Sequence, residues 1–84
     1  MQCSFTDSFN KQLQKLPATT QAQVTKQTEL LIKNKRHPSL HCKKLIGESD
    51  VYSIRIAGRY RALFILTSDT YIFFAIGHRK DIYR

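Results

Sequence analysis

The chain has 84 residues, of which 42% are hydrophobic and 24% charged, and its formal net charge is +8 at pH 7. This length fits one domain over residues 1 to 84, and the composition excludes a disordered or low-complexity protein. No apolar run approaches the roughly 18 residues of a membrane span, and the N-terminus lacks the basic start and apolar block of a secretion signal. We therefore expect a cytoplasmic protein without membrane contacts.

The positive charge is concentrated in the second part of the chain. Residues 1 to 32 hold three lysines and two acidic residues, whereas residues 33 to 84 hold eleven lysines or arginines and four acidic residues. Such an electrostatic field attracts phosphate backbones, acidic proteins or anionic membranes without choosing among them. The binding surface is therefore expected in the second part.

The first elements are predicted to be a short strand and a helix. Residues 2 to 5 fit a strand, and Thr6 or Asp7 fits the N-cap of the helix that follows. The apolar residues of this helix recur at spacings of four and three, which is typical of one buried face. They are Phe9, Leu13 and Leu16.

A second helix is predicted from about Pro17 to about Lys35, because proline ends a helix interior but suits a first helical position. The two helices would form a hairpin. The second has a narrow inward face made by Val24, Thr28 and Leu31. Three cations cluster near its end: Lys33, Lys35 and Arg36. The helix dipole favours cations there and is the preferred explanation for them, and phosphate binding is the alternative.

His37 and Pro38 end the second helix, since the residue before proline avoids helical geometry. We expect an irregular loop from Ser39 to Asp50 that carries Lys43 and Lys44 in its middle.

The two cysteines, Cys3 and Cys42, lack the paired spacing of a zinc site. We expect reduced thiols, with Cys3 buried and Cys42 partly exposed, and neither a metal site nor a cofactor.

Three runs rich in Ile, Tyr, Phe and Arg fill the stretch from Val51 to Tyr83, and turn residues separate them at Ala57-Gly58 and Ser68-Asp69. This pattern predicts an antiparallel strand meander. The fold class is therefore α+β, with an N-terminal strand, a helical hairpin and a three-stranded meander in one sheet.

The expected turns predict which side chains share a face. A two-residue turn at Ser68-Asp69 sets Thr67 opposite Thr70, and therefore Arg61 opposite Ile76. His78 has the parity of Ile76, so it would lie on the face of Arg61.

The preceding strand is expected to add to this face. If Ala57 lies opposite Arg61, then Ser53 and Arg55 join its side. Two helices can cover only one face of the sheet, so the other would form a partly apolar hollow suited to an RNA backbone. The expected rim is Arg55, Arg61, His78, Arg79 and Tyr83.

The order of elements, together with the segments Y-x-I-R, G-R-Y-R-A-L-F and G-H-R-K-D-I-Y, resembles the RelE/ParE superfamily of small bacterial toxins over nearly the whole chain. RelE-like members enter the ribosomal A site and cut messenger RNA. The resemblance implies the catalytic residues Arg55, Arg61, His78, Arg79 and Tyr83. We assign further RNA contacts to Lys43, Lys44, Ser53, Arg59 and Lys80.

The implied reaction is attack of a 2′-OH on the adjacent phosphate, without metal. Arg55, Arg61 and Arg79 would supply positive charge, whereas arginine is a poor proton shuttle. Tyr83 is the expected base and His78 the expected acid. The alternative explanations are a structural His78 and a Tyr83 that only anchors the chain end to the core.

The superfamily also contains ParE-like toxins, which bind gyrase and are not enzymes. A gyrase-binding toxin and an inactive basic binding domain are therefore alternative functions. The resemblance implies a cognate antitoxin, with an acidic segment that covers the basic face, and for a RelE-like member it implies the ribosome and mRNA as further partners.

Overall fold

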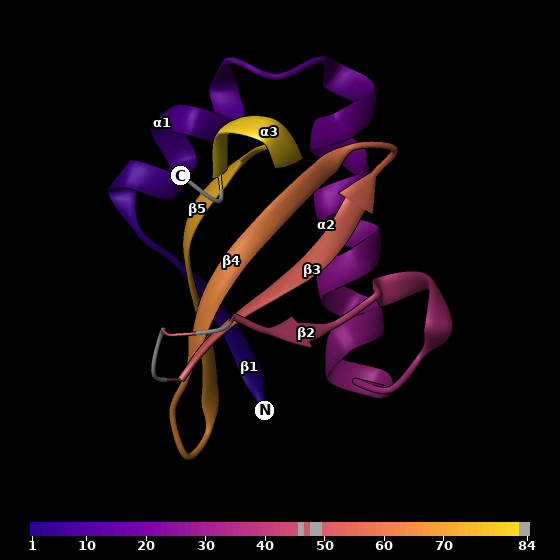
Figure 1. Cartoon of the computed structure of the whole chain (residues 1–84), viewed down its shortest axis with the longest axis vertical. Coiled ribbons are helices and arrows are strands. Elements are labelled where there is room, and N and C mark those ends of the chain that lie inside the picture. The colour runs from indigo at the N-terminus through magenta and orange to yellow at the C-terminus, as the bar shows by residue number, and fades with distance from the viewer. Residues whose placement is uncertain (46, 48–49, 83–84) are drawn as a thin grey trace.

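The computed structural model describes residues 1–45, 47 and 50–82. The five strands form one sheet in the order β1-β5-β4-β3-β2, and α1 and α2 lie on one of its faces (Figure 1). The predicted α+β class, with its N-terminal strand, helical hairpin and meander, is confirmed. The elements are β1 (Gln2–Phe5), α1 (Asp7–Gln14), α2 (Ala18–Lys33), the 3-10 helix η1 (Pro38–Leu40), β2 (Lys43–Lys44), β3 (Val51–Ala57), β4 (Tyr60–Leu66), β5 (Thr70–His78) and α3 (Arg79–Ile82).

The N-terminal elements close one end of the core. β1 is an edge strand that pairs in parallel with β5. The side chain of Thr6 caps α1 by accepting a hydrogen bond from the backbone N–H of Phe9 at 3.1 Å, so Thr6 is the N-cap. Phe9 is fully buried, and its ring centroid lies 5.8 Å from that of Phe73 on β5. Helix α1 is thus fixed to the sheet by aromatic packing.

Helix α2 is joined to two other elements by one polar side chain. Gln27 is buried, and its Nε2 donates to the carbonyl of Arg55 on β3 at 2.9 Å and to that of Ser39 in η1 at 3.3 Å. Buried polar groups of this kind stabilise only when they are paired. The predicted inward residues of α2 were correct, but Gln27 was missed because glutamine alone does not predict burial.

The predicted loop at residues 39 to 50 was wrong in two places. Its start forms η1, which His37 caps by accepting from the N–H of Ser39 at 3.1 Å. Lys43 and Lys44 form the edge strand β2, antiparallel to β3. A two-residue strand has no periodicity, so only the edge of β3 defines it. Helix α3 was also not predicted as a separate element.

The register of β4 and β5 agrees with the predicted turn only as far as Phe64, which pairs with Phe73. A β-bulge then shifts the register, so that Arg61 lies opposite Gly77 rather than Ile76. The extra residue in β5 is Phe74. Because one inserted residue moves all later side chains to the other face, it changes the position of His78.

The register of β3 and β4 also contains an irregularity, between Arg55 and Ala57. Ala57 pairs with Tyr60, so the predicted pairing of Ala57 with Arg61 was wrong. Arg55 instead lies directly opposite Arg61, and Ser53 opposite Leu63. The predicted common face is nevertheless confirmed, because Ser53 and Arg55 lie on the same side of the sheet as Arg61.

An aromatic cluster forms the centre of the core between the helices and the sheet. Phe64 and Phe73 are almost fully buried, with ring centroids 5.1 Å apart. Tyr71 is also buried and meets Phe64 edge-on at 5.2 Å. Full burial of such side chains contributes about 1.5–3 kcal/mol each. These rings therefore set which face of the sheet the helices cover.

We expect Gln27→Leu to lower the free energy of unfolding by about 1–3 kcal/mol, because two carbonyl groups lose their donor in a buried place. Chemical denaturation measures this difference. The same change at Gln23, one turn earlier on α2, is the control and should cost much less. Equal stability of Gln27→Leu and the wild-type chain would contradict the role given to the amide.

The buried Tyr71 is expected to make the free energy of unfolding fall at alkaline pH. Burial, with further effects from Cys3 and Cys42, raises the pKa of Tyr71. The unfolded chain therefore loses the phenol proton of Tyr71 at a lower pH than the folded chain does. The stability that Tyr71 contributes is fully present below about pH 10 and is lost as pH rises through the raised pKa of the folded chain. We expect Tyr71→Phe to flatten the loss of stability above pH 10, measured by urea unfolding at several pH values. Tyr52→Phe, at a half-buried ring on the same face, is the control, and an unchanged slope in Tyr71→Phe would refute the assignment.

Candidate functional site

Two arginines face each other on the side of the sheet opposite α1 and α2. Arg55 on β3 and Arg61 on β4 are directly paired, and both are half-buried. Like charges in directly opposed positions destabilise a sheet. A bound anion between the two guanidinium groups would remove that repulsion, and the planar guanidinium suits phosphate because it can donate two hydrogen bonds at once.

The guanidinium of Arg61 is only loosely held by the protein. Its Nη1 donates to the carbonyls of Gly58 at 3.5 Å and Tyr60 at 3.4 Å, which are long hydrogen bonds. On its other side lies Gly77, where an added Cβ would meet no described atom within 4 Å. The row of Arg55, Arg61 and Gly77 thus combines two cations with open space. Gly77 was not a predicted site residue, because only the bulged register brings it beside Arg61.

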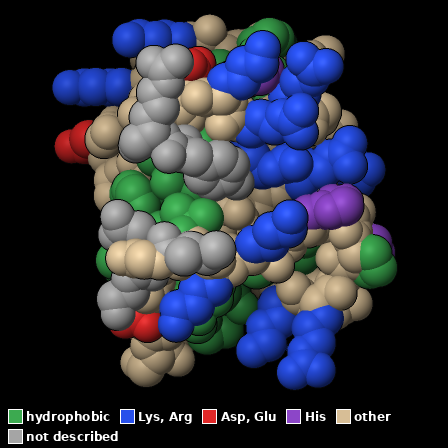
Figure 2. Space-filling model, in the orientation of Figure 1, with side chains coloured by type: hydrophobic (Ala, Val, Ile, Leu, Met, Phe, Trp, Pro, Cys, Tyr) green, Lys and Arg blue, Asp and Glu red, His purple; other side chains and the backbone are tan. Residues whose placement is uncertain are grey.

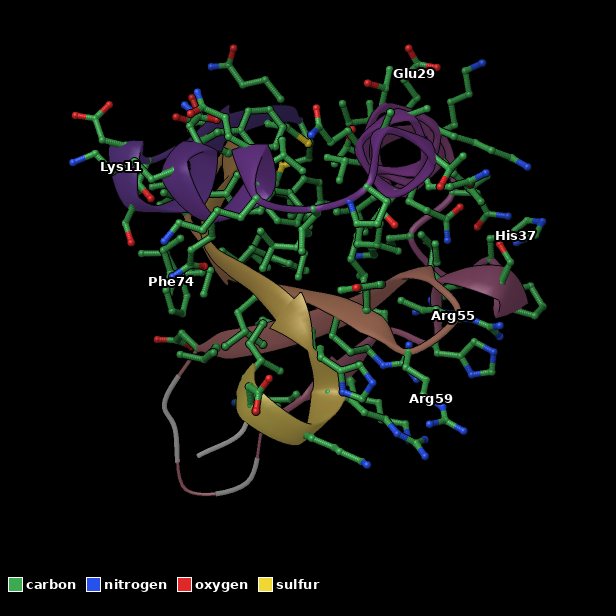
Figure 3. The ribbon with its side chains drawn as sticks, turned by 90° about the horizontal axis from the view of Figure 1, so that it is seen from above. Lys11, Glu29, His37, Arg55, Arg59 and Phe74 are labelled. Carbon is green, nitrogen blue, oxygen red and sulfur yellow. The ribbon has the colours of Figure 1, made fainter. Side chains whose placement is uncertain are left out.

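The turn between β3 and β4 and the start of α3 add further cations. The backbone N–H of Arg79 donates to the carbonyl of Arg59 at 2.8 Å, so the two segments are joined. Arg59, Arg79 and Lys80 are all exposed. Figure 3 shows Arg55 and Arg59 projecting from the same side of the molecule. Three separate elements therefore contribute positive charge near the ends of β3, β4 and β5.

His78 does not share the face of Arg61. It pairs with Tyr60, and the two rings meet edge-on with centroids 5.9 Å apart. The prediction of one shared face was wrong because of the bulge at Phe74. The Nδ1 of His78 accepts a hydrogen bond from the backbone N–H of Lys80 at 3.1 Å. In the neutral ring the proton is then on Nε2, and the side chain holds the first turn of α3.

The remaining predicted residues lie in different environments. Ser53 is almost fully buried, whereas Lys43 and Lys44 are exposed on β2. Lys43 pairs with Ser53 and Lys44 with Tyr52, so the two lysines lie on opposite faces of the sheet. Tyr83, the predicted base, lies outside the described residues.

The charged side chains have a clear distribution on the surface. Figure 2 shows Lys and Arg side chains crowded along one side of the exposed sheet face, with histidines among them, and hydrophobic side chains nearer its middle. Within residues 1–45, 47 and 50–82, no group of three or more His, Cys, Asp or Glu is placed to hold a metal ion. In that same part of the chain, no helix is long and apolar enough to cross a membrane.

Both cysteines are free thiols with raised pKa values. Cys3 is half-buried rather than buried as predicted, and burial raises its pKa. Cys42 is exposed over much of its side chain, but partial burial of its sulfur raises its pKa, and Lys35 offsets part of that effect. Since the nucleophile is the thiolate, neither thiol is activated at neutral pH.

Comparison with known proteins places this arrangement in a family. The family described as "ParE toxin of type II toxin-antitoxin system, parDE" matches residues 3–83. Among curated protein sequences, none matches the chain at a significant level.

Solved structures agree with the family match. The RelB-RelE antitoxin-toxin complex from Methanococcus jannaschii contains a chain of 30% identity and TM-score 0.78, with 95% of this chain and 94% of that chain covered. The toxin-antitoxin complex RelBE2 from Mycobacterium tuberculosis gives 28% identity and TM-score 0.71, covering 93% and 96%. The archaeal RelE-RelB complex from Pyrococcus horikoshii shares the fold at 19% identity, with TM-score 0.77 and coverage of 95% and 96%. The chain therefore belongs to the RelE/ParE superfamily of toxins from type II toxin-antitoxin systems.

Proposed function

We propose that this toxin is a ribosome-dependent endoribonuclease that cuts messenger RNA without a metal ion. The observation that carries the proposal is the direct pairing of Arg55 with Arg61 beside the open space at Gly77. Such a pair lowers fold stability unless an anion lies between its members, so its presence points to a phosphate ligand. An inactive basic binding domain would hold a phosphate with the same pair, and it differs from the nuclease in leaving the bound RNA uncut.

The proposed reaction is an in-line displacement within the RNA backbone. The 2′-oxygen of one nucleotide forms a bond to the adjacent phosphorus, and the bond from phosphorus to the 5′-oxygen breaks. A base takes the proton of the 2′-OH, and the leaving 5′-oxygen receives a proton. The products are a 2′,3′-cyclic phosphate and a 5′-OH. The crowded phosphorane carries extra negative charge, which cations must stabilise.

The arginines are the proposed electrostatic groups. Arg55 and Arg61 would contact the non-bridging oxygens of the scissile phosphate, and a preorganised donor of this kind can contribute about 3 kcal/mol. Arg79, held to Arg59 through its backbone, would add charge from the α3 side. We propose backbone contacts to the neighbouring nucleotides for the exposed cations Lys43, Arg59 and Lys80. Lys44 lies on the opposite face of the sheet and Ser53 is almost fully buried, so the two are not included.

Proton transfer is assigned to two other residues. Tyr83 remains the proposed base, because a phenolate can accept the proton of the 2′-OH. His78 is the proposed acid. As the imidazolium it would give its Nε2 proton to the leaving 5′-oxygen, and the neutral ring that remains accepts from the N–H of Lys80 through Nδ1. Because the ring lies on the Tyr60 side of the sheet, the leaving nucleotide would have to pass the end of β5.

An antitoxin is the proposed protein partner. The relatives from Methanococcus jannaschii and Mycobacterium tuberculosis were crystallised as toxin-antitoxin complexes. A chain with net charge +8 favours an acidic antitoxin segment over the arginine-bearing face. Ribosome and mRNA are the other proposed partners.

The second candidate function is a non-enzymatic toxin that binds gyrase. It is favoured by the description of the matching family as ParE toxins of parDE systems. A gyrase-binding toxin needs a protein-binding surface, and opposed arginines have no evident purpose in it.

We expect Arg61→Ala and Arg55→Ala each to lower the rate of ribosome-programmed mRNA cleavage by at least about a hundredfold, because each removes a donor to the developing charge. Neither change should lower thermal stability much, since each relieves the repulsion of the arginine pair. Lys11→Ala, at an exposed position on α1, is the control of equal charge change. Full activity of the Arg61 variant would remove the pair from the mechanism.

A direct comparison separates the two candidate functions. The purified chain is added in parallel to a ribosome-programmed mRNA and to a DNA supercoiling reaction with gyrase. We expect cleavage of the mRNA at discrete positions, with 2′,3′-cyclic phosphate ends, and no change in supercoiling. Gyrase inhibition with intact mRNA would reverse the assignment.

A further inference from the structure

A groove opens on the helix-facing side of the sheet, between the end of α2 and the adjacent ends of β3, β4 and β5. It consists of two adjoining cavities of about 470 and 410 Å³, and both have Leu31, Lys35, Arg36 and Tyr71 in their walls. These shared residues form the junction of the two cavities. Concave volumes of this size are typical of small-molecule sites. Lys35 and Arg36 were predicted only as cations near a helix end, so the sequence analysis did not find this groove.

The larger cavity has an apolar base that continues into the core. Leu31 on α2 and Phe64 on β4 are 1% and 2% exposed and belong to the hydrophobic core, and both line this cavity. Leu66, two residues after Phe64 on the same face of β4, also lines it and is 39% exposed. Apolar side chains thus extend from the core to the surface along one wall. Covering such a wall with an apolar group is favourable, and apolar side chains exposed around a concavity mark a binding site.

The mouth of the groove is cationic. Lys35 and Arg36 at the junction are exposed, and His37 and His41 line the larger cavity beside them. Of the described residues that line the two cavities, none is acidic. The dipole of α2 accounts for cations near its end, but it does not account for an apolar opening among them. The combination favours a ligand that has both a negative charge and an apolar body.

One polar group at the junction has no partner in the described part of the chain. Tyr71 is 5% exposed and lines both cavities, and its hydroxyl makes no hydrogen bond to a described residue. In residues 1–45, 47 and 50–82, every fully buried side-chain nitrogen or oxygen has a partner, so this hydroxyl is not sealed inside the core but reaches the groove. Because buried polar groups are normally hydrogen-bonded, the phenol indicates a ligand with an acceptor atom at the junction.

We propose that the groove binds a medium-chain fatty acid, with the carboxylate at the junction and the hydrocarbon chain in the larger cavity. The guanidinium of Arg36 can donate two parallel hydrogen bonds to a carboxylate, and Lys35 adds a second positive charge. The hydroxyl of Tyr71 would donate a further hydrogen bond from the wall of the groove. The hydrocarbon chain would pack against Phe64 and Leu66, and each methylene that it buries adds affinity.

An aliphatic chain fits this groove better than a nucleotide does. Nucleic-acid bases bind proteins by stacking on free aromatic faces. Phe64 is buried, and the ring of Tyr52 already stacks on it, with centroids 5.5 Å apart and an angle of 15° between the planes. The large apolar side chains exposed in the two cavities are Met1, Ile32 and Leu66, and none of them is aromatic. The groove therefore offers hydrocarbon contacts and no stacking surface.

The groove lies on the other face of the sheet from the arginine pair. Tyr52 and Phe64 pack in the core beneath α2, whereas Arg55 and Arg61 occupy the opposite face. A fatty acid in the groove therefore leaves the proposed cleavage site open. Binding in the groove is measured without RNA or ribosomes, so its outcome is independent of the nuclease proposed above.

The test is a titration of the purified chain with decanoate below its micelle concentration, followed by the amide chemical shifts in NMR spectra. Two matched ligands separate the parts of the fatty acid. Decanol has the chain without the charge, and acetate has the carboxylate without the chain. Vesicles of phosphatidylglycerol test an anionic membrane as the other source of such a ligand.

Two variants test the junction. Lys35→Glu with Arg36→Glu reverses the charge at two exposed positions, and Tyr71→Phe removes only the hydroxyl. The matched control is Lys11→Glu with Lys15→Glu, also at exposed positions; Figure 3 shows Lys11 on the opposite side of the molecule from His37. The comparison of decanoate with decanol needs no substitution, so it decides the question even if a variant fails to fold.

We expect decanoate to bind saturably, with the largest shifts at Leu31, Leu66 and Tyr71, and to bind about tenfold or more tightly than decanol or acetate. The charge-reversed variant should bind decanoate about tenfold or more weakly than the wild-type chain, and Tyr71→Phe about fivefold more weakly. The control should stay within about twofold of the wild-type chain.

Equal binding of decanoate and decanol would overturn the inference, because the groove would then be only an apolar surface. Shifts centred on Arg55 and Arg61 would also overturn it, by placing the carboxylate at the arginine pair. Binding of vesicles but not of monomeric decanoate would assign the groove to a membrane instead. Full affinity for decanoate in both the charge-reversed variant and Tyr71→Phe would likewise reject the site.

Discussion

The opposition of Arg55 and Arg61 across β3 and β4 is the constraint on which the exposed face of the sheet depends. It requires the irregularity after Arg55, since a regular continuation of the Ala57–Tyr60 pairing would have set Arg55 opposite Ala62, on the other face from Arg61. Two adjacent like charges lower stability by about 0.2–1 kcal/mol, and the core must compensate for this. Positions at which a fold departs from the most stable choice are often functional.

The sheet divides the protein into two chemically different sides. On one side, Phe9, Phe64 and Phe73 join α1 to the strands in an apolar core. On the other, the arginines meet solvent beside a glycine. Gln27 joins the two sides indirectly, because its amide binds the backbone of Arg55 while its helix forms the core layer. One side-chain hydrogen bond therefore joins α2 directly to the strand that carries Arg55.

One inserted residue explains the largest error in the sequence-based site. The bulge at Phe74 leaves the alternation of β5 intact on both sides of itself but moves His78 to the face of Tyr60. There the ring holds α3 through its Nδ1 atom, a role that a face shared with Arg61 would not have indicated. Local alternation contains no signal for such a bulge, because Phe74 is as apolar as the residues around it.

The sequence by itself determined the order of the main elements, an N-cap at Thr6 or Asp7, the helix break at Pro17, and the turn at Ser68-Asp69, because capping, proline geometry and turn chemistry act over a few residues. It also determined that the charge lies in the second part. Only the tertiary structure decided the two bulged registers, strand β2, the place of Gly77 beside Arg61, and the groove at the end of α2. Each of these depends on contacts between residues far apart in the chain, which no local pattern specifies.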